Sequence, residues 1–227
     1  MDTNFKDKKA LVIGGTSSIG LKVAQMLLSQ GTELTVTGRK FNSAFYNAIY
    51  SPVKFIETDF EKDFDSCFLN NELLTCLKET DILCVCYGPF VKKSLALTSA
   101  SDWKKMALNN YALPGILLSL VLPGMEKRNF GRIIFFGGTK TQSVKGFKTN
   151  AAYAGAKTGL SVLVKSTALE YQSSNITCNA ICPGFTRDAP QETFCVNPAD
   201  LASKVKFLIS SPELNGVILN VDRGWNC

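Results

Sequence analysis

The chain has 227 residues, of which 45% are hydrophobic, and a formal net charge of +6 at pH 7. This is enough for one domain over residues 1–227, and a positive charge spread along the chain without a basic block does not favour a nucleic-acid partner. The absence of histidine removes the commonest metal ligand and the usual acid–base side chain, so we expect no metal site and proton chemistry from Tyr, Lys, Asp or Glu.

Two further features bear on membranes and redox state. No run of about 18 uninterrupted apolar residues occurs, and the chain begins with the polar stretch MDTNFKDKK, so we expect no membrane span, no secretory signal and no membrane partner. The eight cysteines include no CxxC pair and lie mostly in apolar stretches, where cysteine behaves as a small hydrophobe. We therefore expect a soluble cytoplasmic protein with reduced thiols.

The first predicted strand, KALVIGG, runs into the glycine-rich turn GGTSSIG and then into a predicted helix that Gly31 ends. Small residues let such a turn approach a pyrophosphate, and the amide groups at the start of the helix stabilise its charge. Many glycine-rich turns only connect a strand to a helix. The position after the first strand favours a nucleotide site, whose candidate residues are Gly14, Thr16, Ser17, Ser18, Ile19 and Gly20.

The second predicted strand, ELTVTG, ends where a dinucleotide-binding fold usually has an acidic residue that binds the adenosine ribose. Gly38 takes that place, and Arg39 and Lys40 follow it. A carboxylate would repel a 2′-phosphate, whereas a guanidinium pairs with it, so we predict NADP(H) rather than NAD(H) as the cofactor. The alternative is that Arg39 is an ordinary solvated loop charge.

Five more apolar runs follow: VKFIETD, DILCVCYG, GRIIFFGG, NITCNAICPG and NGVILNVDRG. With the first two they make seven nearly continuous apolar strands separated by helical patterns. This predicts an α/β fold, a doubly wound seven-stranded parallel sheet with helices on both faces. The helical pattern before GRIIFFGG contains Pro114 and Pro123, so we expect that helix to kink or to end early.

The third helical pattern carries Tyr153 and Lys157 in the stretch YAGAK. A spacing of four places both side chains on one face of a helix, one turn apart. A nearby ammonium favours the phenolate and lowers the pKa of the tyrosine, as a general acid or base requires where histidine is absent. By itself this pair is common and usually structural.

Together these motifs resemble the short-chain dehydrogenase/reductase family over residues 8 to 225. The resemblance rests on GGTSSIG after the first strand, YAGAK about 140 residues later, and NITCNAICPGF just after that helix. It implies a Rossmann fold and hydride transfer between a nicotinamide and a carbonyl or alcohol.

The same resemblance implies roles for individual residues. Tyr153 would give its proton to the carbonyl oxygen, and Lys157 would hold the nicotinamide ribose and lower the pKa of the tyrosine. Asn110 would anchor a water that supplies protons through Lys157. Further cofactor contacts are implied at Asp59, Phe60, Gly88, Pro183, Gly184 and Thr186.

The stretch GRIIFFGG departs from the family at a serine whose hydroxyl binds the substrate oxygen. Gly138 occupies that position, and Thr139 offers the same donor and acceptor groups one residue later. We expect Thr139 to be the catalytic substitute, with Thr141 or no hydroxyl at all as alternatives. The segment after Thr186 is shorter than the family's lid, so we also expect an open substrate pocket.

These features predict an NADP(H)-dependent oxidoreductase of a small-molecule carbonyl or alcohol, similar to 3-oxoacyl-carrier-protein reductases. The alternative is a catalytically weak or inactive relative that binds nucleotide and acts as a sensor or oligomer partner. If the family's habit holds, helices over 104–128 and 152–173 pair in a homodimer or homotetramer. Their apolar residues fit such pairing and packing on the sheet equally well: Leu117, Leu120, Val121, Leu163 and Leu169.

Overall fold

The computed structural model describes residues 5–40, 43–49, 52–186 and 195–224. Seven parallel strands form its central sheet in the order β3-β2-β1-β4-β5-β6-β9. They coincide with the seven apolar runs of the sequence, so the predicted Rossmann sheet is confirmed. The strands are β1 (Lys9–Ile13), β2 (Glu33–Gly38), β3 (Lys54–Glu57), β4 (Ile82–Val85), β5 (Gly131–Phe136), β6 (Ile176–Pro183) and β9 (Ile218–Val221).

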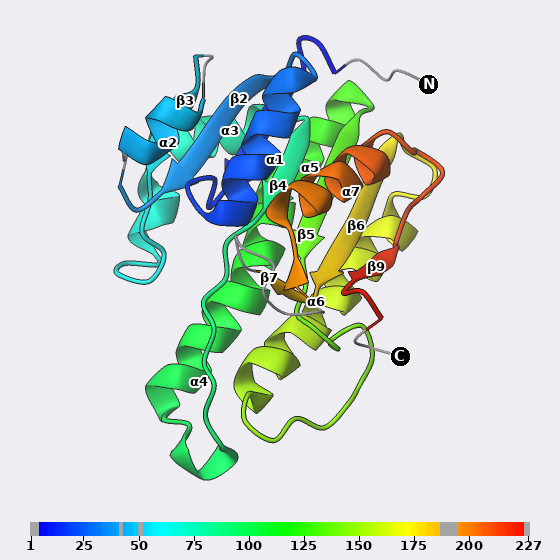
Figure 1. The fold of residues 1–227 in the computed structure, drawn as a ribbon. Helices are drawn as coiled ribbons and strands as arrows, with labels where there is room; N and C mark the ends of the chain where they lie inside the picture. The colour runs from blue at the N-terminus through cyan, green and yellow to red at the C-terminus, as the bar shows by residue number, and fades with distance from the viewer. Residues whose placement is uncertain (1–4, 41–42, 50–51, 187–194, 225–227) are drawn as a thin grey trace.

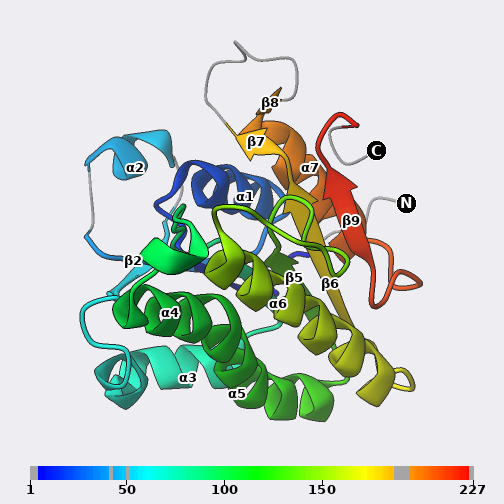
Figure 2. The same ribbon diagram turned by 90° about the horizontal axis from the view of Figure 1, so that it is seen from below.

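Helices cover both faces of this sheet (Figures 1 and 2). On one face α1 (Ser18–Ser29) packs against α7 (Pro198–Ile209). The other face carries α3 (Asn71–Glu79), α5 (Leu113–Arg128) and α6 (Ala151–Glu170). The strand order reverses between β1 and β4, and in open α/β sheets ligands bind beside the carboxyl ends of the strands at that point.

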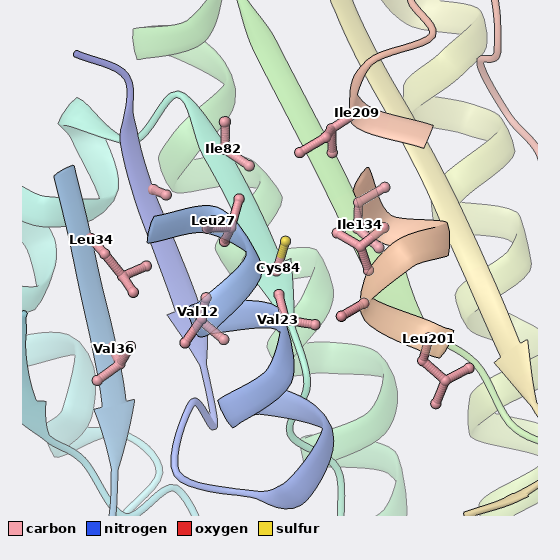
Figure 3. Packing of buried hydrophobic residues seen from close by; sticks show 14 of the residues in the cluster. Val12, Val23, Leu27, Leu34, Val36, Ile82, Cys84, Ile134, Leu201 and Ile209 are labelled. Atoms are coloured by element: carbon pink, nitrogen blue, oxygen red, sulfur yellow. The ribbon is translucent and has the colours of Figure 1, made fainter. Parts of the chain in front are cut away.

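The central strands of the sheet contribute side chains to two buried clusters, one on each face, whereas the buried apolar residues of β2, Leu34 and Val36, belong to only one of them. In β1, Val12 packs with Val23 and Leu27 of α1, as Figure 3 shows. Its neighbour Leu11 points to the other face and joins the cluster that includes Leu117 of α5. Both faces of the central strands are therefore apolar, which explains why these strands read as continuous rather than alternating apolar runs.

Of the two outcomes expected for the helix before β5, a kink or an early end, the early end is wrong. Helix α4 (Ala100–Ala107) continues through a π-helical turn, η3 (Leu108–Ala112), into α5, which runs to Arg128. In the wide turn the amide of Leu113 donates to the carbonyl of Leu108, five residues back. Pro114 then falls in the first turn of α5, where a missing N–H costs little. The helical run therefore accommodates Pro114 by widening into a π-turn just before it, and does not end there.

This long helical run also bears on two other expectations. Among the described residues, Ala100–Arg128 is the one stretch with the length and hydropathy of a membrane span, but half of its most apolar window is buried, as in a core helix. Leu117 and Val121 are fully buried against the sheet, so packing on the sheet is their role. Leu169, near the end of α6, is 69% exposed.

The remaining elements are short. Helix α2 (Ser43–Ala48) follows β2, the turn η1 (Ser66–Leu69) precedes α3, and the turn η2 (Leu95–Leu97) precedes α4. Strands β7 (Phe185–Thr186) and β8 (Cys195–Val196) pair with each other after β6. The segment 187–194, on which the expected open pocket depends, lies outside the described residues.

Candidate active site

The glycine-rich turn joins β1 to α1 at the carboxyl edge of the sheet. Gly14 has a φ of +77°, a left-handed conformation that favours glycine, and its amide donates to the Thr37 hydroxyl of β2 at 3.2 Å. Ser17 is the N-cap of α1: its hydroxyl accepts the Gly20 amide at 3.1 Å and donates to the Gly14 carbonyl at 2.9 Å. The cap fixes both the turn and the start of the helix, where an anion is stabilised.

A pocket of about 320 Å³ lies against this turn. Six of the predicted cofactor residues line it: Gly14, Thr16, Ser17, Arg39, Phe60 and Gly88. Sequence reasoning missed the other lining residues, namely Thr37, Gly38, Thr58, Glu61, Cys86, Tyr87 and Pro89. These lie at or just beyond the carboxyl ends of β2, β3 and β4, so the strand ends themselves were the signal that could have found them.

Several other predicted cofactor residues do not line this pocket: Ser18, Ile19, Gly20, Asp59, Pro183, Gly184 and Thr186. The Asp59 carboxylate accepts the amides of Glu61 and Lys62, at 3.1 and 3.3 Å, and so caps its own turn. Phe60 turns inward, and its ring lies 5.5 Å from the ring of Tyr87. Thr58 and Phe60, the two neighbours of Asp59, therefore line the pocket in its place.

Gly88, just after β4, connects this pocket to the candidate catalytic side chains. A Cβ atom added at Gly88 would lie 2.5 Å from Asn110 Oδ1 and 3.0 Å from Lys157 Nζ. Asn110 and Lys157 are thus brought together on either side of one glycine backbone, although 47 positions separate them in the sequence. A larger residue at Gly88 would push into both.

Asn110 lies in the π-turn and is fully buried. Its Nδ2 donates to the carbonyl of Pro89 at 3.0 Å, which ties the turn to the loop after β4. Its Oδ1 has no hydrogen-bond partner among the described residues. A buried acceptor without a partner is costly, and a bound water is the usual remedy, as the family's relay would require.

Tyr153 and Lys157 lie one turn apart on α6, as predicted, but their electrostatics differ from expectation. Burial raises the pKa of the Tyr153 phenol to about 12. Burial also lowers the pKa of the Lys157 ammonium to about 8, and the ammonium donates to the Phe136 carbonyl at the end of β5 at 2.7 Å. The predicted lowering of the tyrosine pKa is absent in this arrangement, because burial of the phenol dominates.

Two other groups touch the phenol of Tyr153. A Cβ atom added at Gly138 would lie 3.0 Å from the phenol oxygen and 2.8 Å from the ring carbon Cε1. Tyr153 therefore occupies the space that a serine side chain would need at this position. On another side the exposed ring of Phe90 meets the Tyr153 ring edge to face, with centroids 4.8 Å apart.

The two threonines that could replace the missing serine both have backbone partners. The Thr139 hydroxyl donates to the carbonyl of Pro183 at 2.8 Å. The Thr141 hydroxyl accepts the amide of Gly138 at 2.9 Å and donates to its carbonyl at 2.8 Å, which closes the turn after β5. Thr141 is fully buried, whereas Thr139 is half-buried and has the less constrained hydroxyl.

A larger cavity, of about 1100 Å³, lies elsewhere in the described part of the chain. Its lining includes Lys9, Glu33 and Lys54, which begin their strands, and none of the predicted site residues. The volume of a cavity alone would therefore not identify the candidate catalytic residues. We place the candidate active site beside the smaller pocket, where Gly88 connects the glycine-rich turn to Asn110 and Lys157. These two residues and Tyr153 do not line the pocket itself.

The residues of this site fit a nicotinamide dinucleotide. The backbone of the capped turn and the start of α1 suit a pyrophosphate, and side chains from the ends of β2 and β3 line one side of the pocket. Gly88 leads from there to Lys157, whose ammonium suits ribose hydroxyls.

The sequence of this chain is similar to those of known proteins. A family model described as short chain dehydrogenase matches residues 8–194. The chain is 28% identical to the short chain dehydrogenase adrF of Penicillium roqueforti, with 98% of both chains covered. It is also 28% identical to the 3-oxoacyl-[acyl-carrier-protein] reductase FabG of Rickettsia bellii, with 97% of this chain and 98% of that protein covered.

The fold has close counterparts among solved structures. A short chain dehydrogenase/reductase family protein superposes with a TM-score of 0.86 over 99% of both chains, at 24% identity. That identity supports the fold, and the family match over 187 residues supports the relationship. The chain belongs to the short-chain dehydrogenase family, whose members are oxidoreductases that bind a nicotinamide cofactor, NAD or NADP.

Proposed function

We propose that the protein is an NADP(H)-dependent oxidoreductase that transfers hydride between the nicotinamide and a carbonyl or alcohol. The observation that carries this proposal is the junction at Gly88, where the pocket of the glycine-rich turn meets Asn110 and Lys157, one helical turn from Tyr153. A chain that only bound nucleotide would have no need to keep all three side chains together.

The preference for NADP(H) rests on the charges around the adenosine end of the pocket. Arg39 is exposed at its rim, directly after the strand end where an acidic residue would select NAD(H). Glu61 also lines the pocket, but it forms an ion pair with Lys105 of α4. Arg39 is therefore available to pair with a 2′-phosphate, while the carboxylate that lines the same pocket has its own cation.

When bound, the cofactor supplies or accepts the hydride. Tyr153 holds the proton that the carbonyl oxygen takes up, and its elevated pKa keeps it protonated at neutral pH. Lys157 positions the ribose and, below its pKa of about 8, keeps a positive charge near the phenol. Asn110 offers its free Oδ1 to a water from which the proton can be replaced.

Thr139 is our candidate for the hydroxyl that polarises the substrate oxygen. It is half-buried beside Gly138, and a rotation about its side-chain bond would release it from the Pro183 carbonyl. Thr139→Val should lower kcat/KM about 10²-fold, because one preorganised donor is lost. Thr139→Ser should restore most of that loss, and Thr149→Val in the same exposed loop is the control.

The names of two relatives support one class of substrate. They include a 3-oxoacyl-[acyl-carrier-protein] reductase and a D-beta-hydroxybutyrate dehydrogenase of Cupriavidus necator, 26% identical over 96% of this chain. Both names denote a substrate with oxygen at the third carbon of a carboxylic acid or its thioester. We propose a 3-oxoacyl compound as the first substrate to assay.

The test is NADPH oxidation with a panel of 3-oxoacyl esters and thioesters, run beside simple ketones. Turnover that falls by at least about 10³-fold in Tyr153→Phe, with NADPH binding kept, would support the assignment. Turnover unchanged in Tyr153→Phe would contradict it. No turnover with any carbonyl, despite tight NADPH binding, would favour the catalytically inactive nucleotide-binding relative.

We further propose that the protein forms a homodimer or homotetramer through α6. Val162 and Leu169 lie on this helix with exposed side chains, at 59% and 69%, while its other face packs on the sheet. Exposed apolar side chains seven residues apart lie on one face of a helix and suit pairing with a second copy.

A further inference from the structure

The positive charge of the chain is concentrated at one end of the molecule. The segments 86–112 and 137–155 contain seven of the 25 basic residues and one of the 19 acidic residues, which leaves 18 of each for the rest of the chain. Both views place these segments together beyond the carboxyl ends of the strands, around the starts of α4 and α6 (Figures 1 and 2). The net positive charge of the chain therefore lies in two segments at one end of the molecule, although it looked evenly spread along the sequence.

The same end presents apolar side chains to solvent. In η2, Leu95 and Leu97 are 65% and 73% exposed, and Val144 in the loop before α6 is 92% exposed. Trp103, in the first turns of α4, is also exposed. We call the exposed lysines and exposed apolar side chains of these two segments the basic tip. Its exposed lysines are Lys92, Lys93, Lys104, Lys145 and Lys148.

Polar contacts hold the apolar residues of the tip outward. Asp102 accepts the Lys93 ammonium at 2.6 Å and the Ser99 amide at 3.0 Å, and Ser99 caps α4 in return. The Thr98 hydroxyl donates to the Ser94 carbonyl at 2.7 Å across the η2 turn. Leu95 and Leu97 are thus exposed in a turn that the Thr98–Ser94 hydrogen bond and the Lys93–Asp102 ion pair hold in place.

Charge complementarity identifies what this surface fits. Exposed leucines and a tryptophan that share these segments with exposed lysines match an anionic lipid surface, where apolar side chains enter the headgroup layer and lysines meet lipid phosphates. We propose that the basic tip docks the protein peripherally on anionic membranes. This departs from the expectation of no membrane partner, which rested on the lack of a spanning segment and could not take account of side-chain exposure.

The tip adjoins the candidate active site. Phe90, at the base of the η2 loop, contacts the ring of Tyr153, so the docked face leads directly to the phenol. If the proposed function holds, docking would favour substrates that partition into lipid, such as long-chain carbonyl compounds. That last step rests on the proposed function, whereas docking itself does not.

The experiment is flotation of the purified protein with vesicles of phosphatidylcholine, with and without phosphatidylglycerol. We expect binding to the anionic vesicles alone, weakened by salt. Leu95→Ser/Leu97→Ser should weaken it about tenfold or more, and Lys145→Gln/Lys148→Gln about fivefold for each lysine. In a Trp225→Phe background, a blue shift of Trp103 fluorescence on vesicle addition would report insertion of the tip.

Matched variants elsewhere on the surface are the controls. Leu69→Ser removes a leucine that is 78% exposed in η1, and Lys204→Gln/Lys206→Gln removes two exposed lysines of α7. Both should bind vesicles like the wild type. Equal losses in control and tip variants, or no vesicle binding by the wild type, would overturn the proposal. So would a changed molar mass of the leucine variant in light scattering without vesicle binding, which would assign the tip to contacts between copies.

NADPH binding by the same proteins separates the two proposals. Vesicle binding without NADPH binding would leave docking intact and remove the proposed function. NADPH binding without vesicle binding would leave the proposed function intact and remove the docking proposal.

Discussion

At the scale of single residues, the environment of Lys157 has a measurable consequence for stability. Burial lowers its pKa to about 8 in the folded chain, from 10.5 in the ordinary case. Between these values the unfolded chain holds the proton and the folded chain does not, so folding is favoured as pH rises through this window. Below about pH 8 both states are protonated, and the folded state bears the full cost of a buried charge.

The stability of the wild type relative to Lys157→Met should therefore rise by about 2 kcal/mol between about pH 7 and pH 10. Urea unfolding of both proteins at the two pH values measures this difference, because other titrating groups cancel in the comparison. Lys165→Met, on the exposed side of the same helix, should show no such trend. A wild type that loses stability relative to Lys157→Met as pH rises would contradict the assigned pKa.

Gly138 gives a second test at this scale. Restoring the family's serine would place a Cβ atom 3.0 Å from the Tyr153 oxygen, so the ring must move. Because small displacements of catalytic groups are costly, we expect Gly138→Ser to lower kcat/KM about tenfold or more. Gly146→Ser in the same loop, where a Cβ meets nothing within 4 Å, should have no effect. A gain of activity in Gly138→Ser would show that only the hydroxyl was missing.

At the scale of elements, the capped start of α1 ties stability to cofactor binding. Ser17→Ala removes the hydroxyl that bonds to Gly14 and Gly20, and loss of an N-cap typically costs about 1 kcal/mol. We expect that loss of stability together with weaker nucleotide binding, since the turn that it fixes lines the pocket. Ser29→Ala, at the far end of the same helix, should leave nucleotide binding unchanged. Chemical unfolding and a nucleotide titration measure the two effects.

The elements also show how far sequence reasoning reached. The central strands were predictable because a sheet buried on both faces makes them continuous apolar runs, and α1 was predictable from Gly31 at its end. The π-turn before Pro114 was not, because a proline inside a helical pattern is compatible with a kink, an early end or a wide turn, and the contacts of this turn with α6 join segments far apart in sequence.

The candidate site divides in the same way. The glycine turn, Tyr153 and Lys157 could be identified from their spacing on one turn or helix. No local sequence pattern predicts the raised pKa of the Tyr153 phenol or the contacts of Gly138 and Phe90 with the Tyr153 side chain. They depend on segments that are far apart in the sequence. The same holds for the basic tip, whose two halves are joined only by the fold.

At the scale of the whole molecule, the proposed assembly through α6 can be separated from the fold. Val162→Ser/Leu169→Ser changes two exposed side chains, so the monomer should stay folded. If α6 pairs with a second copy, the wild type should have the molar mass of a dimer or tetramer in light scattering and the variant a smaller one. A monomeric wild type would contradict the proposed assembly.

Calorimetric titration of the purified protein with NADPH and with NADH is the decisive test of whether the pocket beside the glycine-rich turn binds NADP(H). We expect tight binding of NADPH, weaker binding of NADH, and a loss of that preference in Arg39→Ala because the 2′-phosphate loses its guanidinium. Equal binding of both nucleotides, unchanged in Arg39→Ala, would refute the NADP(H) preference. Binding of neither would contradict the account as a whole.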